Sequence, residues 1–196
     1  VQKGLEHLNP CRRPGFQALL RVCGVRGRVT PTEISFKLAP KINAAGRVDD
    51  PNLGVKLLLS QSLTEARPYA GKMFSLNQQR QKIEARVFSD AFAQARQQIN
   101  QKALILVDQQ WHPGVMGNIA SRISRHFGKT TLALTFNAGT STERFQESIA
   151  VGSARSVGDL DLCSLLQECR QMLNRFGGHP AAVGLSLSVK NLDRFC

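Results

Sequence analysis

Apolar side chains recur at helical spacing through the first half of the chain. Residues 14–24 predict a short, partly buried helix, because a Pro stands where a first turn tolerates it and a Gly supplies a stop. Residues 30–33, Thr-Pro-Thr-Glu, have the cap, proline and acid of a second helix start. We expect that helix to end before Pro40 and residues 41–50 to form a loop.

Residues 64–99 repeat apolar side chains at three-, four- and seven-residue intervals, with almost no helix breaker after Pro68. This pattern predicts one long amphipathic helix whose other faces carry Gln and Arg. About 35 residues at 1.5 Å each extend on the order of 50 Å. A helix that is so long and so polar more often connects two bodies than lies within one, so we expect a connector.

After residue 100 the pattern changes to short apolar runs that alternate with amphipathic stretches. We predict strands at 103–107, 131–136, 147–151 and 184–188, and helices at 114–127 and 160–176, each helix closed by Gly. Strands separated by helices of about 15 residues predict a sheet covered by helices. The expected fold class is therefore α/β, with a long connecting helix followed by a small α/β domain at residues 101–196.

The charge of the chain indicates which class of partner it binds. The 196 residues hold 26 Lys and Arg against 14 Asp and Glu, a formal net charge of +12. Residues 1–48 alone carry +7, from nine cations against Glu6 and Glu33. Such an excess favours a polyanionic partner, most often nucleic acid, over the alternative of a generally basic soluble protein. The content of 42% hydrophobic and 20% charged residues is typical of a globular chain.

Several classes of protein are disfavoured. The longest apolar runs have about five residues against the roughly 18 of a membrane span, and there is no signal peptide, so we expect a cytoplasmic protein with no membrane partner. Five Cys without a C-x-x-C pair disfavour a disulfide scaffold and a zinc ribbon. The chain starts at Val1 and stops just after the pattern of a helix start, so we expect both ends to be cut from a longer protein.

Metal ligands are scarce in the sequence. A two-metal phosphoesterase site needs carboxylates and imidazoles that converge on ions about 4 Å apart. The four His are scattered, at His7, His112, His126 and His179. The neighbours Asp49 and Asp50 are better explained as a turn and helix start before Pro51. No P-loop, recognisable Ser-His-Asp arrangement or dinucleotide fingerprint is present.

Two segments combine small residues with groups that bind phosphate. Residues 41–47 end in Arg47, whose planar fork suits a phosphate after a small-residue loop, although a glycine turn with a solvated Arg explains them equally well. Residues 111–115, Trp-His-Pro-Gly-Val, follow a strand and open a helix, where α/β domains bind anions. The structural alternative for Trp111 is a half-buried lid on the core.

Two further segments lie later in the chain. Residues 152–156 place two hydroxyls and Arg155 at a strand end, which suits phosphate oxygens. Residues 177–180 read Gly-Gly-His-Pro, and Gly177 is explained as a helix C-cap. The second Gly and His179 go beyond that need, although a lone His is ambiguous.

These segments together resemble, in order and spacing, the RecJ family of single-strand-specific DNA exonucleases in the DHH phosphoesterase superfamily. The matching motifs are residues 43–47 with Asp49-Asp50, residues 111–115 with Ala120-Ser121-Arg122, residues 153–156, and residues 177–184. The Asn-Ala-Ala-Gly-Arg segment and the long helix favour RecJ over the small-oligonucleotide phosphodiesterases of the superfamily.

The resemblance implies a division into three parts. Residues 1–50 would be the C-terminal tail of a DHH domain, 51–100 the connecting helix, and 101–196 the DHH-associated substrate-binding domain, truncated at its C-terminal end. The Mn²⁺ or Mg²⁺ of the family would be held by Asp-rich motifs and an Asp-His-His triplet that are missing here and would lie upstream. We therefore expect this chain alone to be inactive.

The resemblance also implies a function: part of a metal-dependent 5′-to-3′ exonuclease that acts on single-stranded DNA in repair and recombination. His179 and Arg47 would position the phosphate for catalysis. The residues implied to bind nucleic acid are Asn43, Arg47, Trp111, His112, Arg122, Ser153, Arg155, Ser156, Gly177, Gly178 and His179. A monomer is expected, with single-stranded DNA and a single-strand-binding protein or helicase as partners. The alternatives are a small-oligonucleotide phosphodiesterase and a non-enzymatic nucleic-acid-binding module.

Overall fold

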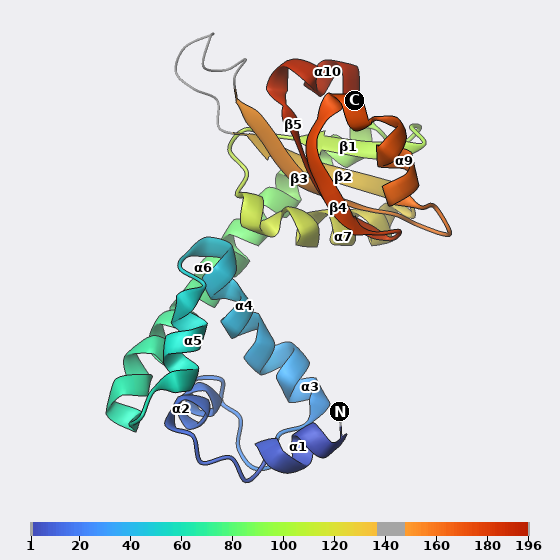
Figure 1. The fold of residues 1–196 in the computed structure, drawn as a ribbon. Coiled ribbons are helices and arrows are strands. Elements are labelled where there is room, and N and C mark those ends of the chain that lie inside the picture. The colour runs from blue at the N-terminus through green and yellow to red at the C-terminus, as the bar shows by residue number, and fades with distance from the viewer. Residues whose placement is uncertain (1, 137–147, 196) are drawn as a thin grey trace. The chain divides into compact units, whose positions relative to one another are not determined.

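The computed structural model describes residues 2–136 and 148–195 (Figure 1). The chain divides into two compact units, Val1–Lys82 and Ile83–Cys196. The predicted long helix is confirmed as α6 (Leu63–Gln97), whose first part belongs to the first unit and whose second part belongs to the second. Within the described residues, no helix combines the length and the apolar character that a membrane span requires.

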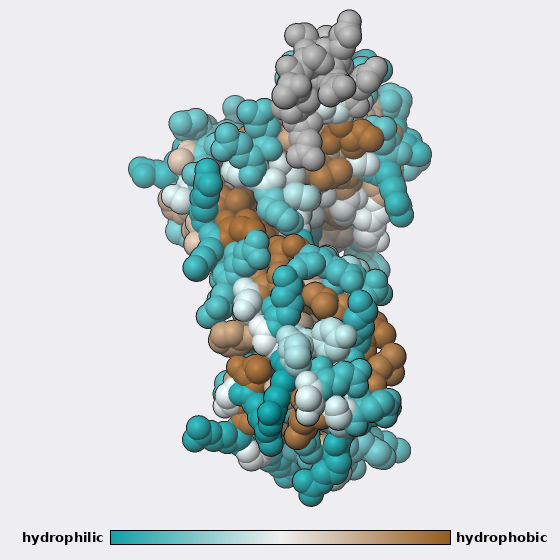
Figure 2. Space-filling view, turned by 90° about the vertical axis from the view of Figure 1, so that its left-hand side faces the viewer, coloured by the Kyte–Doolittle hydropathy of each residue, from teal (hydrophilic) through white to brown (hydrophobic). Residues whose placement is uncertain are grey.

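Helices are the only regular elements in the described part of the first unit. They are α1 (Gln2–Leu8), α2 (Pro14–Val22), α3 (Pro31–Glu33), the π-helical turn η1 (Ile34–Leu38), α4 (Ala39–Val48), α5 (Asn52–Leu59) and the start of α6. Their core includes the fully buried Leu19, Leu57 and Met73. Apolar side chains also reach the surface at Phe36, Val55 and Leu59, and Figure 2 shows brown patches among the hydrophilic side chains.

The predicted helix start at Thr30 is confirmed, but its predicted end before Pro40 is wrong. Thr30 Oγ1 accepts a hydrogen bond from the Glu33 amide at 3.3 Å, and the Glu33 carboxylate accepts one from the Thr30 amide at 3.1 Å. The chain then continues through η1 into α4, where Pro40 stands in the first turn and its missing N–H is tolerated. Residues 41–48, predicted as a loop, are therefore helical.

A five-stranded sheet organises the second unit and confirms the expected α/β fold class. Its strands are β1 (Ala103–Val107), β2 (Thr130–Phe136), β3 (Ile149–Arg155), β4 (Leu173–His179) and β5 (Ala182–Ser188). The order is β1-β2-β3-β5-β4, with β1 parallel to β2 and the other pairs antiparallel. The strands predicted at 103–107, 131–136 and 184–188 are confirmed. The strand predicted at 147–151 is found at 149–155, and residue 147 lies outside the described residues.

Helices cover both faces of this sheet (Figure 1). The second part of α6 and α7 (Met116–Phe127) pack on the face that carries Leu104 and Ala133. The predicted helix at 114–127 is thus confirmed, with a short 3-10 turn η2 (Pro113–Val115) at its start and Gly128 as its left-handed cap. The opposite face carries Leu134 and is covered by α9 (Leu162–Glu168). The chain ends in η4 (Val189–Asn191) and α10 (Leu192–Phe195).

The predicted helix at 160–176 is correct only in its first half. After α9 and the short turn η3 (Arg170–Met172), the chain forms β4 instead. A bulge between Leu173 and Arg175 shifts the register, so that Leu173 and Phe176 both pack on the face covered by α9. This three-residue spacing imitates a helical pattern within a strand. Gly177 is therefore a strand residue, and its predicted helix-capping role is wrong.

The outer edge of β1 is paired with side chains instead of with another strand. Gln94 of α6 both donates to the Val107 carbonyl and accepts from the Val107 amide, each at 3.0 Å. Gln98 makes the same pair of bonds with Ile105, at 2.8 and 2.9 Å. Because backbone groups at a sheet edge otherwise have no ladder partner, these side-chain amides satisfy the outward groups of Ile105 and Val107 and fix α6 against the sheet.

Candidate nucleic-acid interface

The strand register brings four predicted site residues onto one face of the sheet. Ser153 of β3 and Gly177 of β4 share one row, through a β5 residue that pairs with both. Arg155 and His179 share the next row in the same way. Because residues at matching positions of neighbouring strands project to the same side, and residues two apart along one strand do too, all four lie on the face that α7 covers over β2 and β3.

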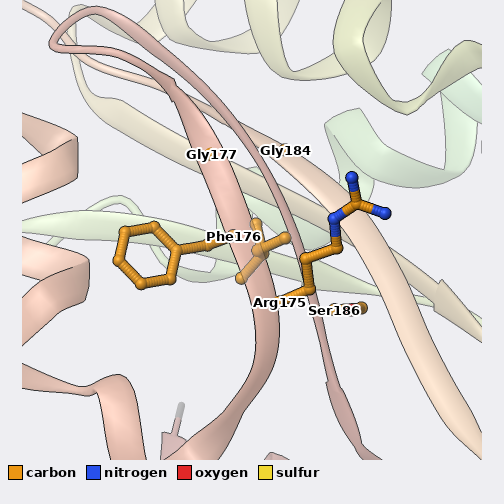
Figure 3. Close-up of a pocket in the computed structure, with 6 residues that line it drawn as sticks. Arg175, Phe176, Gly177, Gly184 and Ser186 are labelled. Atoms are coloured by element: carbon orange, nitrogen blue, oxygen red, sulfur yellow. The ribbon is translucent and has the colours of Figure 1, made fainter.

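Beyond α7, over β5 and β4, this face is exposed. Gly177, His179 and Gly184 are exposed residues. A hollow in the surface is lined by Arg175, Phe176, Gly177, Gly184, Leu185 and Ser186. Figure 3 shows that Arg175 and Phe176 leave β4 on opposite sides, and by register it is Arg175 that shares the face of Ser153.

The glycines of this region differ in what the fold requires. A Cβ on Gly177 would meet no atom within 4 Å, and one on Gly184 would come no closer than 3.9 Å to any neighbour. Gly178, in contrast, has a φ of +155°, and a Cβ there would lie 2.2 Å from the Ala182 carbonyl oxygen. Backbone geometry explains Gly178, whereas packing explains neither Gly177 nor Gly184, beside which there is open space.

The guanidinium of Arg155 is held against α7. Its Nε donates to Ser121 Oγ at 3.1 Å and its Nη1 to the Ala154 carbonyl at 2.8 Å. Its Nη2 lies beside Gly117, close enough that a Cβ on that glycine would approach it to 2.9 Å. The neighbouring Ser156 follows β3 and donates its amide to the Ala181 carbonyl at 3.1 Å.

Three further predicted residues have partners within the fold. Trp111 is only 4% exposed and packs in the core, so it is more deeply buried than a half-buried lid. His112 Nδ1 accepts a hydrogen bond from the Gly114 amide at 3.1 Å and so caps η2. Arg122 lies 3.5 Å from Glu84 and 3.7 Å from the centre of the Phe88 ring, which ties α7 to α6. Their contacts with nucleic acid stay predictions.

In the first unit, the Asn-Ala-Ala-Gly-Arg segment is the end of helix α4. Ala44 and Ala45 are completely buried, so their small size lets α4 pack closely on its core. Asn43, Gly46 and Arg47 stand at helical spacing on the other side of α4. These residues are therefore helical and not the predicted loop, and the phosphate contacts of Asn43 and Arg47 stay predictions.

The two neighbouring aspartates form a turn, as predicted. Asp49 ends α4, and its carboxylate lies 2.9 Å from Lys72 Nζ. The hydrogen bond from Lys72, followed by that from the Asp50 amide, holds the pKa of Asp49 below its ordinary value. Asp50 accepts from the amide of Asn52, the first residue of α5, at 2.9 Å. Asp50 thus shapes the start of α5, whereas Asp49 links the end of α4 to Lys72 of α6.

Metal ligands do not converge in the part of the chain that the structure describes. Across residues 2–136 and 148–195, no three His, Cys, Asp or Glu side chains lie where they could hold one ion together. The groups that share the face of Ser153 and His179 are hydroxyl, guanidinium and imidazole groups. Such groups donate hydrogen bonds and suit phosphate oxygens.

Arg175 is absent from the predicted site residues because residues 160–176 are predicted as one helix. The signal that reveals it is the alternation of Arg175, Gly177 and His179 at the two-residue period of a strand. Gly117 and Ser121 carry no such signal, because only the folded chain places them beside Arg155.

Comparison with known proteins adds a family match in the second unit. Residues 100–196 match the DHHA1 domain family. The single-stranded-DNA-specific exonuclease RecJ of Bacillus subtilis (strain 168) is 34% identical over 191 residues, which cover 96% of this chain and 23% of that protein.

Solved structures match over the whole chain. The crystal structure of RecJ in complex with Mg²⁺ from Thermus thermophilus has a TM-score of 0.79 and 28% identity, and covers 100% of this chain and 29% of that one. The structure of RecJ in complex with Mn²⁺ from the same organism has a TM-score of 0.79 and 27% identity, covering 99% and 27%. This chain thus spans less than a third of each protein. These matches confirm the resemblance that the motifs carry.

Proposed function

Since this chain belongs to the RecJ family and carries a DHHA1 domain at residues 100–196, we propose that it is the substrate-binding part of an exonuclease that degrades single-stranded DNA from its 5′ end. Mn²⁺ or Mg²⁺ would be held elsewhere in the whole protein, because the described residues offer no cluster of ligands that fits an ion. When bound, the metal supplies an activated water for phosphodiester hydrolysis. We assign this activity to DNA repair and recombination in the cytoplasm.

The observation that carries the proposal is one face of the sheet, which α7 partly covers at β3 and which is exposed over β5 and β4. Ser153, Arg155 and His179 stand there in two neighbouring rows, about 6.6 Å apart along the strands. The open space beside Gly177 and Gly184 lets a sugar-phosphate backbone come close to the sheet. The formal charge of +12 attracts a polyanion to the chain as a whole.

Each residue has a defined part in this proposal. Arg155 presents a planar fork to a phosphate, Ser153 donates its hydroxyl, and His179 donates from its imidazole to an oxygen near the scissile bond. Arg47 offers a second fork from α4. Asn43, His112, Arg122 and Ser156 would contact the strand at its margins, whereas Trp111 and Gly178 keep the site in shape.

The test is the affinity of the purified chain for single-stranded DNA across a series of salt concentrations. Each phosphate contact should contribute about 0.7 to the slope of log affinity against log salt. Arg155→Ala should weaken binding more than about tenfold, because a hydrogen bond to a charged group is lost. Arg170→Ala is the matched control, since Arg170 lies 6.0 Å from the ring of Phe176, on the opposite face. An affinity that does not change with salt concentration would contradict the proposal. Equal losses of affinity in the Arg155→Ala and Arg170→Ala variants would contradict it too.

The small-oligonucleotide phosphodiesterase alternative predicts a different response to substrate length. A RecJ-type segment should bind longer single strands better than di- or trinucleotides, and the alternative should show no such gain. We expect the purified chain to release no nucleotides with Mn²⁺ or Mg²⁺, because the residues that the structure describes offer no cluster of metal ligands. Any robust metal-dependent release would contradict this. We further propose a monomer that acts with a single-strand-binding protein or a helicase.

A further inference from the structure

Two residues of α7 contact Arg155 and have no part in the proposal above. Ser121 accepts a hydrogen bond from Arg155 Nε at 3.1 Å. Gly117 stands one helical turn earlier on the same side of α7, so that a Cβ on it would lie 2.9 Å from Arg155 Nη2 and 3.6 Å from Ser153 Oγ. Ser121 thus fixes the guanidinium by a hydrogen bond, and Gly117 leaves space for it because it has no side chain.

We propose that Gly117 and Ser121 are positioning residues that set the direction in which Arg155 presents its guanidinium to a DNA phosphate. The inference rests on the proposed function, because it takes Arg155 as the phosphate ligand. A free arginine side chain populates many rotamers, and ordering it on binding costs free energy. The bond from Nε to Ser121 and the bond from Nη1 to the Ala154 carbonyl order this side chain before the ligand arrives.

The fold alone gives no reason for a glycine at residue 117. Its φ is not positive, and the atoms that a Cβ would meet first belong to the flexible end of Arg155 and the hydroxyl of Ser153. Glycine inside a helix is less favourable than alanine. Gly117 is therefore unfavourable for the helix itself. It stands where the methyl group of an alanine would approach the guanidinium of Arg155 to 2.9 Å.

The first experiment separates affinity from stability in the full chain. Gly117→Ala should displace Nη2 and weaken binding of a 5′-phosphorylated oligothymidylate about three- to tenfold, the loss of one ordinary hydrogen bond. Its melting temperature should be unchanged or higher, because alanine favours the helix. Gly71→Ala is the matched control. Gly71 is also helical, in α6, with no atom within 4 Å of its Cβ position, so its substitution should leave affinity unchanged.

The second experiment asks whether the effect acts through Arg155. Ser121→Ala should weaken binding, whereas Ser121→Thr, which keeps the hydroxyl, should restore most of the affinity. In an Arg155→Ala background, Gly117→Ala and Ser121→Ala should cause no further loss, because no guanidinium is left to position. A purely structural role for either residue would give the same loss in both backgrounds.

The outcomes distinguish the two proposals. If Arg155→Ala weakens binding and Gly117→Ala does not, the positioning role is overturned while the proposed function stands. If Gly117→Ala weakens binding equally with and without Arg155, the positioning role is also overturned. If Arg155→Ala leaves the affinity unchanged, the phosphate-binding role of Arg155 falls, and the positioning role falls with it.

Discussion

Two segments rich in small residues, 43–47 and 177–184, look alike in sequence and differ in structure. In the first, Ala44 and Ala45 are completely buried and their size is explained by the packing of α4. In the second, only Gly178 has a backbone reason to be glycine, and the space beside Gly177 and Gly184 is open. A small residue points to a ligand only after packing and backbone conformation have been accounted for, and by that measure the second segment is the stronger candidate.

The largest expected effect lies within the second segment. Gly178→Ala should lower the free energy of unfolding by at least about 2 kcal/mol, because its Cβ would collide with the Ala182 carbonyl and its φ disfavours a side chain. Gly177→Ala should change it by less than about 0.5 kcal/mol. Urea denaturation of both variants measures the difference. Equal stabilities would remove the distinction between the two glycines.

The next effect tests the packing explanation of the first segment. Ala45→Leu should destabilise the first unit by about 1–3 kcal/mol, because Ala45 is fully buried and a larger side chain overpacks a buried site. Gly46→Ala is its control, since a Cβ there makes only an ordinary contact with Pro51 at 3.5 Å. If the Gly46→Ala variant stays folded but binds single-stranded DNA poorly, the first segment also has a small residue that serves a ligand. The distinction between the two segments would then be wrong.

A smaller effect is expected on DNA binding by the second segment. His179→Ala should weaken binding of single-stranded DNA about tenfold, or about 1.4 kcal/mol, with little change in stability, because the exposed imidazole loses one bond to a charged group. His126→Ala serves as a control, since His126 is also exposed and packs edge-on against Phe92. Equal affinities of the His179 variant and the parent chain would leave the second segment without a ligand-binding imidazole.

The smallest effect is a dependence of stability on pH next to the first segment. Because the folded chain holds the pKa of Asp49 below its ordinary value near 3.9, its ionised form stabilises the fold above that value. This contribution should be lost as the pH falls through the lowered folded pKa. Lys72→Met should flatten the acid side of a melting-temperature profile and leave DNA affinity near pH 7 almost unchanged. A large loss of affinity would give this turn a binding role.

The sequence predicted the regular elements whose signals are local. The long helix and the strand at 103–107 follow from periodicity, and the helix at 114–127 also has its Gly128 stop. The errors at Pro40 and at residues 169–176 have specific causes. The π-helical turn η1 leads directly into α4, so the helix continues through Pro40. The bulge in β4 places Leu173 and Phe176 on one face of a strand at a three-residue spacing that is typical of a helix.

The same limit applies to the candidate site. Short motifs point to Ser153 and Arg155, because that segment combines hydroxyl and guanidinium groups at a strand end. A lone His is ambiguous, so His179 is predicted only through the resemblance to the RecJ family. Which of these groups share a face depends on the pairing of β3, β5 and β4, which no local pattern encodes. For the same reason, the contact of Ser121 with Arg155 became visible only in the folded chain.

The glutamine side chains along β1 have a consequence for how the second unit can be produced in isolation. The DHHA1 family match starts at residue 100, whereas Gln94 and Gln98 precede it. A protein shortened to that boundary would leave the amides and carbonyls of Ile105 and Val107 open along a sheet edge. Open edges pair with other chains, so such a truncation should be prone to dimerisation and aggregation, and a start point upstream of Ile83 should avoid both.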